Sequence, residues 1–175
     1  WTQAGRIEFA RAGGRVNTDF IDNSAGVDTS DHEVNIKVLL APEVRAGRLG
    51  GPERDALLAS MTDEVAQLVL AHNVDQNIAL SMAQAKAPDM QGAQEAWMRR
   101  LEAEAGLDRR LEGLPDSHEM ERRMAAGEPL TRPELCSLLA WTKIRLEQVM
   151  LASPLPDDPY LADRLITYFP RALRS

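Results

Sequence analysis

Cysteine is almost absent from this chain of 175 residues, with Cys136 as its single example. One cysteine cannot form a disulfide within the chain, which fits a reducing compartment and leads us to expect a cytoplasmic protein. Long apolar runs are also missing, so no segment reaches the length of a membrane span, and the N-terminus lacks a signal-peptide pattern. The chain starts at Trp1 instead of methionine, which is compatible with a piece of a longer protein but does not decide the question by itself.

Positive charge is scarce as well. There are 20 Lys and Arg residues against 27 Asp and Glu residues, a formal net charge of −7. This balance argues against a general binder of nucleic-acid phosphates and against strong attraction to an anionic membrane. The chain also lacks a G-x-G-x-x-G motif after a strand, so the dinucleotide-binding fingerprint is absent from it.

The spacing of apolar residues predicts a mainly α-helical fold. Capping signals support several helix ends, for example the pattern of Thr131 and Glu134, with Pro133 in the first turn. The expected helices end near residue 12, span 30–42, 52–73 and 74–87, end near 106, and span 115–126, 131–149 and 161–169.

Residues 16–21 alternate weakly between apolar and polar side chains, which predicts one short strand. A lone strand leaves its backbone groups without partners, so we expect its sheet to lie outside this chain. The first 41 residues then read as helix, strand, loop and helix, followed by a multi-helix domain.

The polar segment 14–37 is the best candidate for a ligand site. Residues 23–27 are small or polar, and small side chains let a ligand approach the backbone. Ser30 and Glu33 have the spacing of a capping box, which would place Ser30 at a helix N-terminus, where anions bind readily. The alternative is that Ser30 is only a helix cap, and composition alone favours that interpretation.

Asp28, Asp31, His32 and Glu33 invite a metal-site interpretation. However, residues 31–33 are consecutive and diverge around a helix axis, so we predict no metal site. Cys136 lies in an apolar helical stretch and is predicted to be a buried structural thiol. We expect three arginine pairs to lie on solvated faces beside glutamates, at residues 99–100, 109–110 and 122–123.

Several blocks of the chain resemble the large bacterial NAD-specific glutamate dehydrogenases. The resemblance begins in residues 17–37 and continues through LASMTDEV at 58–65, DQN at 75–77, LTRPEL at 130–135 and YFP at 168–170. The related hexameric glutamate dehydrogenases carry the motif N-A-G-G-V-x-x-S-x-x-E. Residues 23–33 read NSAGVDTSDHE, which keeps the asparagine, one glycine, the valine, the serine and the glutamate at the same spacing.

The resemblance implies roles for three residues of this segment. Asn23 is implied to lie near the nicotinamide ribose and the substrate. Val27 and Ser30 are implied to line the pocket for the substrate side chain, with the Ser30 hydroxyl bound to the distal carboxylate of glutamate. The catalytic lysine and aspartate of the family are implied to lie upstream, so no catalytic residue is expected in this chain.

The resemblance further implies that residues 1–41 are the end of a Rossmann-type NAD-binding catalytic domain and residues 42–175 a C-terminal helical domain. The implied reaction of the parent enzyme is oxidation of L-glutamate with NAD and water to 2-oxoglutarate, ammonia and NADH. We expect a homo-oligomeric parent and an inactive isolated chain that packs on the rest of the same polypeptide. An alternative is that the helical part is a structural or regulatory module for packing or assembly.

Overall fold

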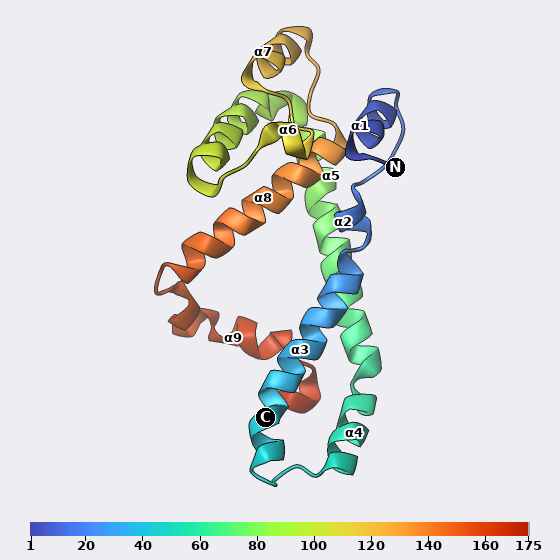
Figure 1. Cartoon of the computed structure of the whole chain (residues 1–175), viewed down its shortest axis with the longest axis vertical. Coiled ribbons are helices and arrows are strands. Elements are labelled where there is room, and N and C mark those ends of the chain that lie inside the picture. The colour runs from blue at the N-terminus through green and yellow to red at the C-terminus, as the bar shows by residue number, and fades with distance from the viewer. Residues whose placement is uncertain (175) are drawn as a thin grey trace. The chain divides into compact units, whose positions relative to one another are not determined.

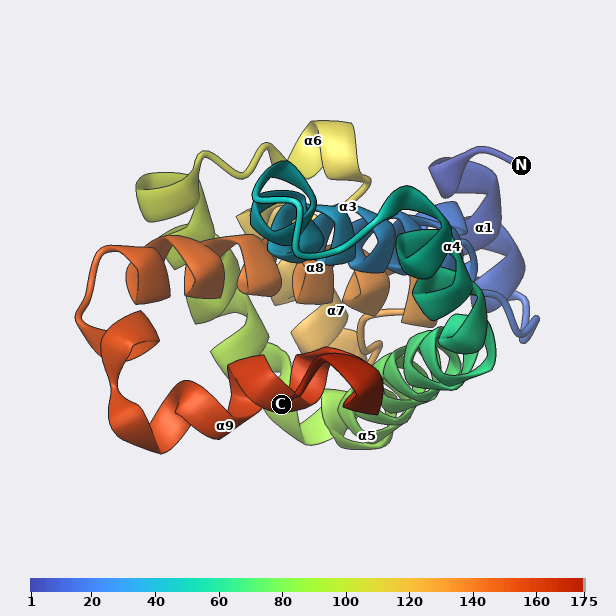
Figure 2. The same ribbon diagram turned by 90° about the horizontal axis from the view of Figure 1, so that it is seen from below.

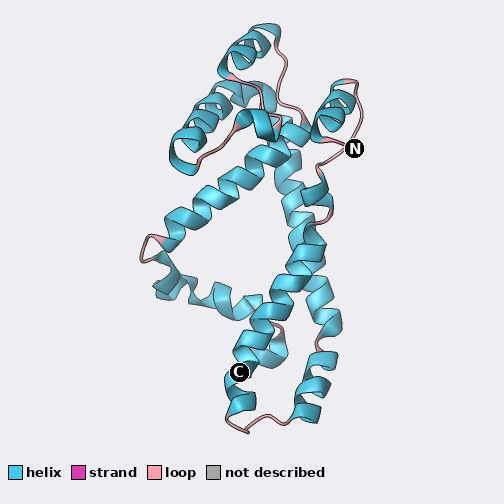
Figure 3. Cartoon of the chain, in the orientation of Figure 1, coloured by secondary structure: helices cyan, strands magenta, loops and turns pink. Residues whose placement is uncertain are grey.

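The computed structural model describes residues 1–174, and these residues form helices connected by short loops (Figures 1 and 3). The mainly α-helical prediction is therefore confirmed. None of the described helices is long and apolar enough to cross a membrane. The helices are α1 Gln3–Arg11, α2 Asp19–Asp22, α3 Ser24–Arg45, α4 Gly51–Ser60, α5 Thr62–Ala105, α6 Arg109–Glu112, α7 Ser117–Ala126, α8 Arg132–Leu151, η1 Leu155–Asp157, α9 Pro159–Tyr168 and η2 Arg171–Leu173.

The chain divides into two compact units. Unit 1 contains Trp1–Asp22 and Gln76–Ser153, and unit 2 contains Asn23–Asp75 and the chain from Pro154 onward. The long helix α5 contributes its start to unit 2 and the remainder to unit 1. The predicted domain boundary between residues 41 and 42 stays a prediction, and it lies within helix α3.

Unit 1 has an extensive core, in which α5, α7 and α8 bury apolar side chains against one another. Its completely or almost completely buried members include Leu80, Met98, Leu101, Met120, Leu135 and Cys136. Helix α1 packs on the start of α8, which runs unbroken to Leu151 (Figure 2). The predicted burial of Cys136 is confirmed.

Side-chain and glycine caps define the ends of α7 and the start of α8, which lie within two residues of the predicted ends. The Asp116 side chain accepts a hydrogen bond from the Glu119 N–H at 2.8 Å and starts α7. Gly127 ends α7 with a φ of +66°, a left-handed conformation that glycine adopts without strain. Glu134 accepts hydrogen bonds from the backbone N–H and the hydroxyl of Thr131, both at 2.7 Å, which confirms the predicted capping box.

Unit 2 is built on antiparallel packing of α3 against the first part of α5. Near the start of α3, the Ser24 hydroxyl accepts a hydrogen bond of 2.7 Å from the Asn73 side chain. Near its end, Ile36 and Leu40 pack with Met61, which lies between α4 and α5. This small core is completed by partly buried residues, among them Phe169 and Leu173 from the C-terminal segment.

The predicted strand at residues 16–21 is wrong. Residues 14–18 have no regular secondary structure, Asp19–Asp22 form the single turn α2, and no strand occurs among residues 1–174. The N–H groups of Ile21 and Asp22 both donate to the Thr18 carbonyl, at 3.2 Å each. This turn satisfies backbone groups locally, which a lone strand cannot do. The strand at the end of a Rossmann-type domain is therefore not present in this structure.

The helices are longer than predicted because prolines do not end them. Pro42 lies inside α3, and Pro88 lies inside α5, which also continues through His72. An internal proline costs about 3 kcal/mol in a helix. In α5, burial of Leu80, Ala87 and Met98 on one core holds the residues on both sides of Pro88 in a helix and offsets this cost.

Candidate functional site

Helix α3 begins six residues earlier than predicted, at Ser24 instead of Ser30. Asn23 is its N-cap residue, although the Asn23 side chain makes no capping hydrogen bond. The Asn23 side chain lies over Gly26, where an added Cβ atom would stand 2.9 Å from Asn23 Oδ1. Glycine at position 26 therefore leaves the space that this asparagine side chain occupies.

Asn23, Val27 and Ser30 lie on one face of α3, because they are spaced by four and three positions. All three are exposed, and Val27 has 61% of its surface accessible. The Ser30 hydroxyl donates to the Gly26 carbonyl at 3.3 Å. The structure thus brings the three predicted substrate-binding residues together on an open surface.

The predicted position of Ser30 at a helix N-terminus is wrong. Ser30 lies in the second turn of α3, where its backbone N–H is used by the helix itself. A capping role and an anion site made of free backbone N–H groups are both excluded by this position. A role for the Ser30 hydroxyl in binding a carboxylate stays a prediction.

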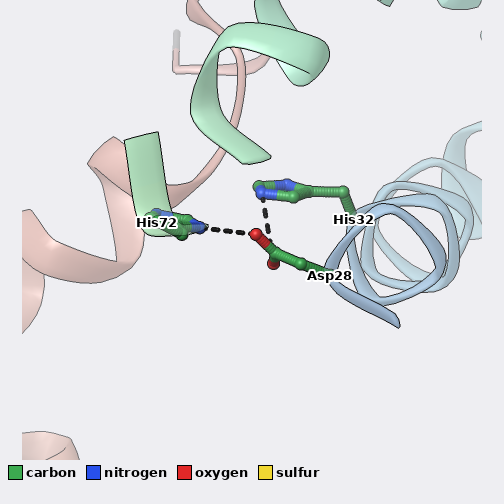
Figure 4. A group of neighbouring side chains, drawn as sticks. All are labelled: Asp28, His32 and His72. Atoms are coloured by element: carbon green, nitrogen blue, oxygen red, sulfur yellow. Dashed lines mark hydrogen bonds and ion pairs between the residues drawn. The ribbon is translucent and has the colours of Figure 1, made fainter. Parts of the chain in front are cut away.

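A second face of α3 carries a cluster of Asp28, His32 and His72 (Figure 4). Asp28 and His32 are four positions apart on α3, and His72 comes from α5. His72 Nδ1 lies 2.8 Å from Asp28 Oδ2, and His32 Nε2 lies 3.8 Å from Asp28 Oδ1. The potential ligand atoms of the three side chains all lie within 4.8 Å of one another.

His32 is completely buried, at 0% exposure, yet neither of its ring nitrogens has a hydrogen-bond partner among residues 1–174. The Tyr168 ring stacks on it with centroids 4.3 Å apart and planes inclined by 9°. The Asn35 side chain donates a 3.0 Å hydrogen bond to the Tyr168 hydroxyl and so helps to hold that ring. Burial lowers the pKa of His32, against an opposing effect of Asp28, and favours the neutral imidazole.

Sequence reasoning missed this cluster for two reasons. It compared Asp31, His32 and Glu33, which do diverge, and did not pair Asp28 with His32 across one helical turn. His72 lies 44 positions from Asp28 in the chain, so only the antiparallel packing of α3 on α5 brings them together. The i, i+4 spacing of Asp28 and His32 was the one local signal available.

A groove of about 1230 Å³ in unit 1 contains none of these residues. Its wall includes Arg132, whose guanidinium donates to Asn17 Oδ1 at 2.5 Å and to Ser81 Oγ and Gln84 Oε1 at 3.2 Å. These hydrogen bonds connect α8 to α5 and to the segment before α2. The polar groups of the groove thus have a structural use, and we assign no ligand to it.

Comparison with known proteins decides the family. Residues 1–83 match the family of the bacterial NAD-glutamate dehydrogenase catalytic domain, and residues 127–175 match that of the glutamate dehydrogenase C-terminal region. The chain belongs to the large bacterial NAD-specific glutamate dehydrogenases. Asn23, Val27, Ser30 and the Asp28 cluster all lie within the part that matches the catalytic domain.

Three curated members of the family are similar over almost the whole chain. The NAD-specific glutamate dehydrogenase of Mycobacterium tuberculosis is 51% identical over 174 residues, and that of Pseudomonas aeruginosa 49% over 172 residues. The one from Halomonas elongata is 44% identical over 172 residues. The matches cover 98–99% of this chain but only 11% of each relative, so the chain spans about a ninth of their length.

Proposed function

We propose that this chain is part of an NAD-dependent glutamate dehydrogenase. The enzyme oxidises L-glutamate with NAD and water to 2-oxoglutarate, ammonia and NADH. The observation that carries this proposal is identity of 44–51% along nearly the whole chain to proteins named NAD-specific glutamate dehydrogenase. The cytoplasmic location remains a prediction that rests on the single cysteine.

Within that enzyme, the face formed by Asn23, Val27 and Ser30 binds substrate. The Ser30 hydroxyl donates to the distal carboxylate of glutamate, Val27 contacts the substrate methylenes, and Asn23 lies near the substrate and the nicotinamide ribose. Their shared exposure on α3 supports this proposal, because none of the three belongs to the core of its own unit. Other parts of the enzyme supply the catalytic lysine and aspartate and most of the NAD site.

The same arrangement leads us to infer that the isolated chain has no dehydrogenase activity. One exposed helix face offers a substrate contact on one side only, and the chain holds no dinucleotide fingerprint. The expected result is no glutamate-dependent NADH formation by the pure 175-residue chain. A measurable rate would contradict this inference.

We also propose that the helical part from residue 42 onward packs on the rest of the polypeptide or mediates subunit assembly. The observation behind this is the second half of α8, where a series of apolar side chains is exposed. The exposed residues are Ile144, Leu146, Val149 and Leu151. Sedimentation of residues 42–175 tests assembly, since a folded, monodisperse monomer would contradict an oligomer interface in this part.

The direct test of the substrate-binding proposal uses the full-length enzyme and its Ser30→Ala variant. A lost hydrogen bond to a charged carboxylate costs about 1.5–3 kcal/mol, so kcat/KM for glutamate should fall roughly ten- to hundredfold. Thr29→Ala is the matched control, because Thr29 also donates its hydroxyl within α3, to the Ala25 carbonyl at 2.7 Å, but faces another direction.

The possible results distinguish the proposed dehydrogenase activity from the proposed role of Ser30. A loss in Ser30→Ala with little change in Thr29→Ala supports the substrate role of Ser30. If kcat/KM is equal in both variants and the wild type, the proposed dehydrogenase activity stands, but the substrate-binding role of Ser30 is wrong. If the folded wild-type enzyme forms no NADH from glutamate, the proposed function itself is wrong.

A further inference from the structure

The Asp28 cluster combines the donors that late transition metals prefer, two imidazole nitrogens and one carboxylate. Asp28 and His32 occupy consecutive turns of α3, and His72 approaches from α5 (Figure 4). The ligand atoms therefore come from two helices and converge between them. Groups of exposed acidic side chains are common in proteins that bind no ion, but this cluster contains two histidines, one of them buried.

The distances are close to those of a coordination shell. Tetrahedral zinc holds nitrogen and oxygen ligands at ~2.0–2.2 Å, which separates neighbouring ligand atoms by roughly 3.3–3.5 Å. The observed separations from the Asp28 carboxylate are 2.8 Å to His72 Nδ1 and 3.8 Å to His32 Nε2. These two separations involve different oxygens of Asp28, and all three ligand atoms lie within 4.8 Å of one another, so side-chain rotation is needed to bring them around one ion.

His32 supplies an independent indication of a missing ligand. A completely buried imidazole normally has hydrogen-bond partners for its nitrogens, because an unsatisfied buried polar group is unfavourable. Both nitrogens of His32 have none among the described residues, and Asp28 Oδ1 lies 3.8 Å from His32 Nε2, beyond hydrogen-bond distance. The stacked Tyr168 ring holds the plane of the imidazole ring in place.

Solvent can reach the other side of the cluster. The His72 side chain is 48% exposed and the Asp28 side chain 22% exposed. An ion can therefore enter from solvent, and water can fill the coordination position that the protein leaves open. His32 forms the buried side of the site and His72 the accessible side.

We propose that Asp28, His32 and His72 bind one Zn²⁺ ion, with Nε2 of His32, Nδ1 of His72 and a carboxylate oxygen of Asp28 as ligands. The ion links α3 to α5 inside unit 2 and satisfies the His32 nitrogen that faces Asp28. It thereby fixes the helix that carries Asn23, Val27 and Ser30. The proposal concerns the chain itself and is independent of the proposed dehydrogenase activity.

The test measures metal binding by the purified 175-residue chain. Co²⁺ is titrated as a spectroscopic probe of tetrahedral nitrogen and oxygen coordination, and Zn²⁺ is titrated calorimetrically to give stoichiometry and affinity. His72→Gln is the main variant, since His72 is half exposed. His118→Gln is its matched control, because His118 is the third histidine of the chain, exposed on α7 in unit 1.

We expect one Zn²⁺ per chain and a Co²⁺ spectrum typical of low coordination number. Outer-shell partners of a metal site typically change affinity 10–100-fold, so loss of the ligand His72 should weaken Zn²⁺ binding at least ~100-fold. His118→Gln should bind like the wild type. The nearly isosteric variant Asp28→Asn should also bind Zn²⁺ much more weakly. If circular dichroism shows that His72→Gln is misfolded, Asp28→Asn serves as the test of Zn²⁺ binding by this cluster.

Three results would overturn the proposal. The first is the absence of saturable binding at one ion per chain. The second is unchanged affinity in folded His72→Gln and Asp28→Asn. The third is an equal loss of affinity in His118→Gln, which would indicate adventitious binding to surface histidines. In each of these cases the cluster is a hydrogen-bonded pair beside a buried histidine and nothing more.

Discussion

The two units of this chain bury their side chains very differently. Unit 1 has a core of twelve buried apolar residues, whereas the corresponding cluster of unit 2 has three, Ile36, Leu40 and Met61. In unit 2 the long helix α3 instead exposes a series of large apolar residues. These exposed residues are Val27, Val34, Val38 and Leu39.

The units also differ in how they bury charge. In unit 1, Arg109 lies 2.6 Å from Glu95 and 2.9 Å from Glu102, and Arg123 lies 2.9 Å from Glu134. The side chains of Arg109, Glu95, Arg123 and Glu134 are all nearly inaccessible. Such pairs stay buried only inside a packed and well-satisfied structure. Unit 2 has no comparable buried pair of oppositely charged carboxylate and guanidinium groups among its described residues.

The difference indicates two kinds of role. Unit 1 buries a large apolar core and pairs its buried charged groups, so it can serve as a scaffold, although the second half of α8 also exposes apolar side chains. Unit 2 leaves an apolar helix face exposed beside the proposed substrate residues. An exposed apolar stripe of this kind is typical of an interface, and the rest of the enzyme is the partner that we propose for it.

The largest effect should come from breaking the buried charge cluster of unit 1. Arg109→Ala leaves Glu95 and Glu102 without their shared partner and should lower the free energy of unfolding by about 3–5 kcal/mol. The measurement is urea unfolding followed by tryptophan fluorescence, which reports on unit 1 because Trp1, Trp97 and Trp141 all lie there.

Arg100→Ala is the control for this substitution. Arg100 forms an exposed pair with Glu104 at 2.8 Å, and such pairs contribute at most about 1 kcal/mol. Equal destabilisation by the two substitutions would contradict the view that burial makes the Arg109 cluster important.

Truncating a core leucine to alanine should lower the free energy of unfolding by different amounts in the two units. Leu101 is completely buried in unit 1, and Leu101→Ala should cost about 4 kcal/mol, near the upper end of such substitutions. Leu40 is one of only three buried residues in the small cluster of unit 2 and is 8% exposed, so Leu40→Ala should lower the free energy of unfolding by about 2 kcal/mol.

Tryptophan fluorescence follows the Leu101 variant, and tyrosine absorbance follows the Leu40 variant, because Tyr160 and Tyr168 both lie in unit 2. A cost for Leu40→Ala that equals or exceeds that of Leu101→Ala would remove the contrast between the two cores.

The smallest effect concerns pH. Burial raises the pKa of Glu95, but hydrogen bonds from Arg109, Ser117 and Arg99 outweigh it and hold that pKa below its ordinary value of 4.5. A carboxyl group with a lowered folded pKa stabilises the fold above the unfolded pKa and loses this contribution as the pH falls through the folded pKa. Unit 1 should therefore lose stability progressively below pH 4.5.

Glu95→Gln should flatten this part of the pH profile, measured as urea midpoints by tryptophan fluorescence. A residual slope is expected, because Arg145 and Arg100 lower the pKa of Glu104 and Arg122 lowers that of Glu119. The exposed substitution Glu121→Gln serves as the control. An unchanged profile in Glu95→Gln would show that its carboxylate contributes no pH-dependent stability.

Local signals in the sequence predicted part of this fold. The glycines after α1 and α7 and the capping box at Thr131 depend on a few neighbouring residues, so the pattern alone located these ends correctly. Such signals are short-range and need no knowledge of the packing.

Tertiary packing decided what the sequence did not reveal. Helix α5 continues through Pro88 because the residues around it share one core. The prediction of solvated faces was wrong for Arg109 and Arg123, since carboxylates from distant positions allow their burial. At the candidate site, the common face of Asn23, Val27 and Ser30 follows from their spacing, whereas the meeting of Asp28 with His72 requires the packing of α3 on α5.

We propose that another part of the enzyme covers the exposed face of α3. Hydrogen–deuterium exchange tests it most directly, by comparison of the 175-residue chain with the full-length enzyme. We predict that the amides of Ser24–Arg45 exchange much more slowly in the full-length enzyme, while α7 and the start of α8 exchange alike in both. Equal exchange of α3 in the two proteins would contradict the claim.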